Sequence, residues 1–152
     1  MTLEALLAAA HLLAILTIVV FITSETALCR AAWINARVVE RLVVVDRIYL
    51  VGLAAVLLTG LARTWWGFKG AAWYWTDWLL HLKLALFVAV VVLAFRPAIA
   101  YRRWRAQLQQ TGALPDEAQL TSVRRQVMVA AHLIAVVPVI AAFLARGFGA
   151  AG

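Results

Sequence analysis

Three histidines, His11, His81 and His132, carry the clearest chemical signal in this sequence, because each lies inside a long apolar segment. A side chain that can ionise or bind a metal at membrane depth needs a partner, a cofactor or a water-filled cavity. Neutral imidazole is also a common axial ligand of haem iron. The histidines therefore predict a buried polar site, provided that the elements carrying them bring them together.

Those elements are membrane helices. Of the 152 residues, 66% are hydrophobic and 14% are charged, and the mean hydropathy is +0.93. Crossing a hydrocarbon core of ~30 Å takes ~20 apolar residues, and four stretches reach or approach that length: 3–23, 42–62, 78–95 and 127–144. The first lacks the basic start of a secretory signal, so we expect it to be retained. The sequence predicts an all-α integral membrane four-helix bundle in a single domain, 1–152.

The basic residues predict the orientation of the bundle. Nine of the 14 lie in the connection that follows the first span or in the polar connection 96–125, and a tenth, Arg47, lies near the start of the second span. Basic connections stay in the cytoplasm because Lys and Arg resist translocation. Both termini should then face the non-cytoplasmic side of a bacterial cytoplasmic (inner) membrane, in a multi-pass arrangement. The net charge of +7 is explained by this topology and by anionic lipid, so no nucleic-acid partner is expected.

With this topology, the histidines divide by depth. His11 and His81 fall in the outer half of the bilayer, and His132 falls in the inner half, closer in depth to Glu25 and Asp46. His11 and His81 could therefore clamp a haem iron between two helices, or each could hydrogen-bond a neighbouring helix. Lys83 follows His81 by two residues, so the two side chains point about 200° apart on a helix. Zinc and copper need three or four ligand groups, which this half does not offer.

Five of the seven tryptophans lie between 63 and 78, together with Arg63 and Lys69. Such a segment is typical of an aromatic belt at the membrane interface. It is also compatible with an aromatic lid over a planar ligand, whose carboxylates Arg63 and Lys69 would neutralise.

Two further features concern the cytoplasmic side. Glu25, Asp46 and Arg47 could form a buried ion-paired cluster that joins the first two helices. In the connection 96–125, the third helix is expected to continue past the membrane and to break at Gly112. The fourth should restart near Asp116 and Glu117, whose charges suit a helix N-terminus.

The sequence resembles a family of small bacterial four-helix membrane proteins that are catalogued as predicted membrane proteins of unknown function. An ordered set of short segments carries this resemblance over nearly the whole chain. They are AHLLAI at 10–15, Glu25, DRIY at 46–49, GLAR at 60–63, GFKG at 67–70, Tyr74, Lys83-Leu84, Pro97, RWR at 103–105 and ARG at 145–147.

A second resemblance bears on chemistry. Residues 10–15 (AHLLAI) and 77–84 (DWLLHLKL) are similar to the two signature helices of the HemJ-type protoporphyrinogen oxidases. In those membrane haem proteins, a first-helix histidine and a His-x-Lys element matter for haem and for activity. The resemblance implies that His11 is an axial ligand, with His81 and Lys83 in or beside the site. The Asn-Glu element before their fourth helix is missing here, so haem binding is implied more strongly than porphyrinogen oxidation.

We therefore expect a b-type haem-binding bundle that acts in electron transfer or haem metabolism, with a quinone or a porphyrin as partner. His11 and His81 would bind the iron of haem b, and Arg63, Lys69 or Lys83 would hold its propionates. One alternative is a non-catalytic membrane subunit or assembly factor, in which the histidines only pack. Another is a small transporter whose polar path, lined by His11, His81, Lys83 and His132, could form in a homo-oligomer.

Overall fold

The computed structural model describes residues 2–66, 75 and 77–146, and within these residues it contains four long α-helices. They are α1 (Thr2–Leu28), α2 (Ala36–Trp66), α4 (Trp78–Thr111) and α5 (Glu117–Ala145), with a short 3-10 helix η1 (Ala31–Trp33) between α1 and α2. Each of the four is long and apolar enough to cross a membrane. The predicted all-α bundle with four candidate membrane spans is confirmed.

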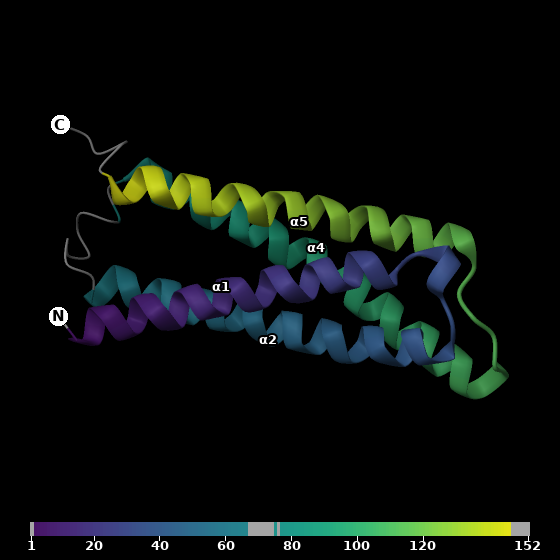
Figure 1. The fold of residues 1–152 in the computed structure, drawn as a ribbon. Helices are drawn as coiled ribbons and strands as arrows, with labels where there is room; N and C mark the ends of the chain where they lie inside the picture. The colour runs from purple at the N-terminus through teal and green to yellow at the C-terminus, as the bar shows by residue number, and fades with distance from the viewer. Residues whose placement is uncertain (1, 67–74, 76, 147–152) are drawn as a thin grey trace.

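The helices run antiparallel as two pairs (Figure 1). α1 packs mainly against α2, and α4 packs mainly against α5, while fewer contacts join α2 to α4 and α1 to α5. At one end of the bundle α1 and α4 end and α2 and α5 begin. We call this the basic end, because the arginines of the two connections lie on that side. α1 begins and α5 ends at the opposite end.

The helices are longer than the apolar stretches that predicted them. α4 has 34 residues and continues to Thr111, so most of the predicted polar connection 96–125 is helical. The helix stops at Gly112, whose φ of 70° is a left-handed conformation that glycine adopts without a Cβ clash. Asp116 then caps α5, because its Oδ1 accepts a hydrogen bond from the backbone N–H of Gln119 at 2.7 Å. The expected break at Gly112 and restart near Asp116 are confirmed.

Each helix buries one stripe of side chains spaced three or four residues apart. On α1 the stripe includes His11, Ile18, Ile22 and Glu25, so it carries a polar residue near each end. Small residues let the helices approach closely where lipid gives no hydrophobic drive for association. At Gly52 of α2 an added Cβ would lie 2.7 Å from Cγ2 of Ile18. At this point of the α1/α2 interface the side chain of Ile18 packs directly on the backbone of Gly52, which only glycine allows without movement.

Candidate functional site

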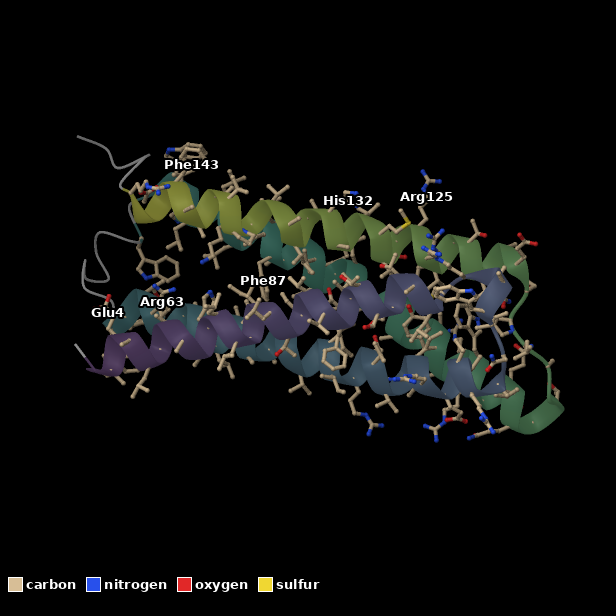
Figure 2. The ribbon with its side chains drawn as sticks, in the orientation of Figure 1. Glu4, Arg63, Phe87, Arg125, His132 and Phe143 are labelled. Atoms are coloured by element: carbon tan, nitrogen blue, oxygen red, sulfur yellow. The ribbon has the colours of Figure 1, made fainter. Side chains whose placement is uncertain are left out.

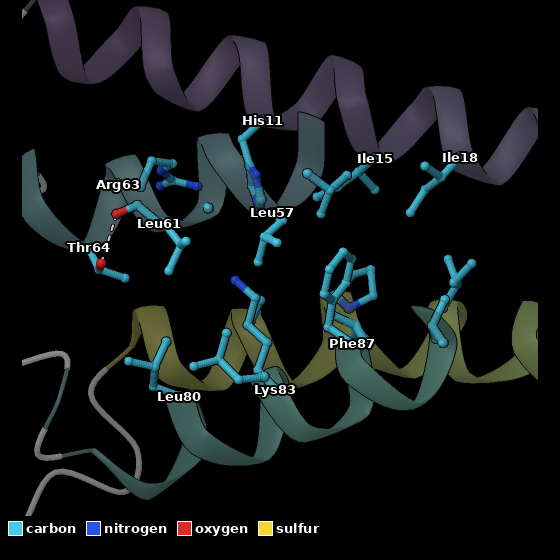
Figure 3. Close-up of a pocket in the computed structure, with 18 of the residues that line it drawn as sticks. His11, Ile15, Ile18, Leu57, Leu61, Arg63, Thr64, Leu80, Lys83 and Phe87 are labelled. Atoms are coloured by element: carbon cyan, nitrogen blue, oxygen red, sulfur yellow. Dashed lines mark hydrogen bonds between the residues drawn. The ribbon is translucent and has the colours of Figure 1, made fainter. Parts of the chain in front are cut away.

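A cavity of about 200 Å³ lies between the two helix pairs, in the half of the bundle away from the basic end. Its walls are mostly apolar, with Phe87 of α4 and Pro138 of α5 among them. Three groups that can carry positive charge also line it, one from each of α1, α2 and α4: His11, Arg63 and Lys83. Figure 3 shows Lys83 reaching from α4 into the space between the pairs, toward the wall that carries His11.

His11 is held in place by α2. It is only 5% exposed, and its Nδ1 lies 2.8 Å from Oγ1 of Thr59. The Thr59 hydroxyl also lies 2.6 Å from the carbonyl oxygen of Ala55 and donates its one proton there. Thr59 Oγ1 is therefore left to accept from Nδ1–H of His11.

This arrangement fixes the tautomer of His11. With the proton on Nδ1, Nε2 keeps its lone pair and can accept a hydrogen bond or bind a metal. The imidazole of His11 shares the cavity with Lys83 and Arg63 and interacts electrostatically with both. Gly60 makes room for the ring, since a Cβ there would lie 3.2 Å from Cε1 of His11.

The charge of the cavity is unbalanced. Arg63 is electrostatically coupled to both His11 and Lys83, and none of the described residues that line the cavity is acidic. Buried charges in proteins are normally paired or hydrogen-bonded. The cavity can thus receive an anionic group, while its apolar walls suit a hydrocarbon body.

Part of the tryptophan-rich segment belongs to this site. Trp75 lines the cavity, and its ring meets that of Trp65 edge to face at 6.0 Å. Lys69, the other predicted anchor for carboxylates, lies outside the described residues.

The structure does not bring His81 to the cavity. Its side chain is exposed, its Nδ1 lies 3.0 Å from the carbonyl oxygen of Asp77, and its ring stacks edge to face on Trp75 at 6.4 Å. The reason is helical geometry: Lys83 points into the bundle with Phe87 and Val90, and a residue two positions earlier points almost the opposite way. The two members of the predicted pair are therefore separated: His11 lines the cavity, whereas His81 lies on the exposed side of α4.

His132 also points away from the bundle. It is exposed on the outer side of α5 (Figure 2), and its Nδ1 lies 2.6 Å from the carbonyl oxygen of Met128. Within this chain, His11, His81, Lys83 and His132 consequently do not line one path. Among residues 2–66, 75 and 77–146, no group of three His, Cys, Asp or Glu side chains could hold a metal ion.

Sequence reasoning missed Thr59 and Gly60, which orient His11. A signal was present, because Thr59 precedes Arg63 by four residues and the two therefore share a helix face. That face could not be assigned to the His11 side of the bundle without knowing how α1 and α2 pack.

The predicted cluster of Glu25, Asp46 and Arg47 is wrong in one member. Glu25 and Asp46 are buried, at 1% and 2% exposure, but Arg47 is exposed. Val45 and Asp46 face the interior, whereas Arg47 and Ile48 fall on the exposed side of α2.

The fold and the cavity define a multi-pass membrane protein whose helices enclose a mostly apolar pocket that His11, Arg63 and Lys83 also line. The comparisons with known proteins agree with that class: residues 3–149 match the model of a family described as predicted membrane protein, DUF2214. The chain belongs to this family. No curated protein and no solved structure matches the chain, and the resemblance to the HemJ-type oxidases has no support from these comparisons.

Proposed function

We propose that this protein binds an amphiphilic anion, a molecule with a carboxylate or phosphate group on a hydrocarbon body, in the cavity between the two helix pairs. The observation that carries the proposal is the pairing of apolar walls with Lys83 and Arg63 and no described acidic neighbour. An anion would neutralise these cations in a site of low dielectric, where charge-assisted hydrogen bonds are strong. Nε2 of His11 would accept a hydrogen bond from a hydroxyl or a protonated acid group of the ligand.

The size of the cavity restricts the part of the ligand that it encloses. Pockets for drug-sized ligands usually measure ~300–1,000 Å³, and this one measures about 200 Å³. It would therefore take the headgroup and the first part of a chain, with the rest of the chain extending between the helices toward lipid.

A binding assay tests the proposal. Palmitate carrying a radiolabel is titrated onto the purified protein, with hexadecanol as a neutral competitor and hexadecyltrimethylammonium as a cationic one. A buried hydrogen bond to a charged group contributes ~1.5–3 kcal/mol, so Lys83→Met should weaken palmitate binding about tenfold to hundredfold. Binding of hexadecanol should change little.

Two control variants make the assay specific. Lys83→Arg keeps the charge and should keep most of the preference for palmitate over hexadecanol. Arg146→Gln removes an exposed cation near the end of α5 and should leave binding unchanged. If hexadecanol competes as well as palmitate itself does, or if Lys83→Met binds palmitate like the wild type, the proposal is wrong.

Haem b is the second candidate, and one observation favours it. Histidines that bind metals almost always donate their other ring N–H to an acceptor, as Nδ1–H of His11 does to Thr59. His81 does not complete the site, and a cavity of about 200 Å³ is below the usual range even for drug-sized ligands. The measurement is the absorption spectrum of protein purified from haem-replete cells: a Soret band that is lost in His11→Ala would establish haem, and colourless protein would exclude it.

We also propose that the basic end faces the cytoplasm of a bacterium, so that both termini lie outside the inner membrane. The support is the excess of arginine in the connections at that end. The cavity would then lie in the outer half of the bilayer.

A further inference from the structure

A second polar cluster lies toward the basic end, away from the cavity. Its members come from three helices and from the residue that follows α1: Glu25, Cys29, Asp46, Tyr49 and Tyr101. All five are at least 98% buried. They interact electrostatically with one another, since both carboxyl groups act on Tyr49 and on Tyr101.

One chain of hydrogen bonds in the cluster links Cys29, Tyr101 and Glu25. Burial raises the pKa of the Cys29 thiol to about 12, so the thiol keeps its proton at neutral pH. Cys29 Sγ lies 3.2 Å from the Tyr101 hydroxyl, which lies 3.4 Å from Oε2 of Glu25. The Tyr101 hydroxyl donates to Glu25, and its contact with Cys29 Sγ extends the chain to the end of α1.

Three oxygens of the cluster have no hydrogen-bond partner among the described residues. Oε1 of Glu25, Oδ1 of Asp46 and the hydroxyl of Tyr49 are fully buried, and the described residues provide no hydrogen bond to any of them. Three such oxygens on residues that interact electrostatically are unusual, because buried polar atoms are nearly always satisfied.

The charges of the surrounding helices do not balance Glu25. Arg102 of α4 is coupled to Asp46, and Arg124 of α5 is coupled to Cys29 while its Nε donates to the carbonyl of Thr26 at 3.3 Å. The charged groups that act on Glu25 itself include Asp46 and no cation among the described residues. An ionised Glu25 would therefore be a buried carboxylate beside a second acidic group, without a positive partner.

We propose that Glu25, Asp46 and Tyr49 form a binding site for a monovalent cation, with Glu25 as the principal ligand. The occupant supplies the missing positive charge. Na⁺ would be coordinated by the three unpartnered oxygens, whereas a proton would bind one carboxylate oxygen and let it donate a hydrogen bond to another oxygen. Either Na⁺ or a proton meets this requirement, and the experiment distinguishes them. The site is separate from the cavity of the proposed function, so either proposal can fail alone.

The first arm of the test is the melting temperature of the purified protein, followed by tryptophan fluorescence in sodium chloride and in choline chloride. A cation that binds only the folded state stabilises it in proportion to the logarithm of its concentration. For Na⁺ we expect a rise of roughly 3–5 °C per tenfold increase above Kd. Glu25→Gln should abolish the dependence, whereas Glu117→Gln, an exposed change at the same end, should retain it.

The second arm is infrared spectroscopy of the C=O stretch of protonated carboxylic acids at neutral pH. If the melting temperature does not respond to sodium, a proton as occupant gives a buried acid band that is absent in Glu25→Gln and present in Glu117→Gln. If Glu25→Gln does not fold, Asp46→Asn replaces it as the site variant, and both the melting temperature and the infrared spectrum are measured on it. The proposal is overturned if the wild-type protein shows neither a sodium-dependent melting temperature nor an acid band from Glu25.

Discussion

At the scale of single residues, the chemistry of His11 is decided by Thr59. One hydroxyl accepts from Nδ1–H and thereby leaves Nε2 as the free nitrogen. The same imidazole in lipid, without this partner, would have no fixed tautomer. Any ligand that reaches His11 therefore meets an acceptor and not a donor.

Replacing Thr59 by valine tests this relation. Thr59→Val keeps the shape of the side chain and removes the acceptor, so a buried N–H loses its main partner. We expect a loss of about 1–2 kcal/mol in the free energy of unfolding, measured by titration with sodium dodecyl sulfate. The ¹⁵N chemical shifts of the His11 ring should report the Nδ1–H tautomer in the wild type and a mixture in the variant.

Thr59→Ser serves as the control, because it keeps the hydroxyl while removing the methyl group. It should preserve the tautomer. An unchanged ¹⁵N spectrum in Thr59→Val would show that Thr59 does not fix the proton on Nδ1.

At the scale of helices, the sequence predicted the spans well and their rotation poorly. Apolar length identified four helices, and Gly112 and Asp116 marked the turn between α4 and α5 with the chemistry that turns require. The sequence did not show which face of α4 turns inward, because this helix is apolar on most sides. The orientation of His81 could therefore not be predicted. The spacing of His81 and Lys83 allowed only one of them to point inward, and packing selected Lys83.

The polar cluster of Glu25, Cys29, Asp46, Tyr49 and Tyr101, the inner cluster, illustrates the same limit. Glu25 and Asp46 were expected to be buried, and they are. Tyr49, Tyr101 and Cys29 were not linked to them, since an isolated tyrosine or cysteine in an apolar helix has no pattern that names its partner. Contacts across helices depend on register, which one sequence does not encode in any local motif.

The packing of α1 on α2 can be tested at Gly52. A Cβ at this position would lie 2.7 Å from Cγ2 of Ile18, so Gly52→Ala must push the two helices apart or rotate Ile18. Overpacking costs about 1–3 kcal/mol, and alanine returns up to about 1 kcal/mol of helix propensity. We expect a net loss of about 1–2 kcal/mol in unfolding by sodium dodecyl sulfate.

Removing the clash should remove most of that loss. In an Ile18→Ala background the added methyl group of Gly52→Ala has space, so the second substitution should cost less than it does alone. Equal costs in both backgrounds would contradict a direct contact between positions 18 and 52.

At the scale of the whole molecule, the proposed orientation assigns each site to one side of the membrane. It can be tested with single cysteines in a Cys29→Ser background, using a maleimide that does not cross membranes. In intact spheroplasts Arg146→Cys should be labelled, whereas Thr121→Cys should be labelled only after lysis. Both positions are exposed, so accessibility within the protein does not bias the comparison. The opposite pattern would place the basic end outside.

The length of the helices has a consequence for the inner cluster. The 34 residues of α4 extend for about 51 Å at 1.5 Å per residue, whereas a hydrocarbon core is only ~30 Å thick. Asp46 and Tyr101 each lie about ten residues, or about 15 Å, from the basic end of their helix. That depth is where acyl chains give way to headgroups if the excess length projects mainly on the arginine-rich side. Ions and water in the headgroup layer would then stand within a few ångströms of Glu25, and a cation could reach it without any passage through the bilayer.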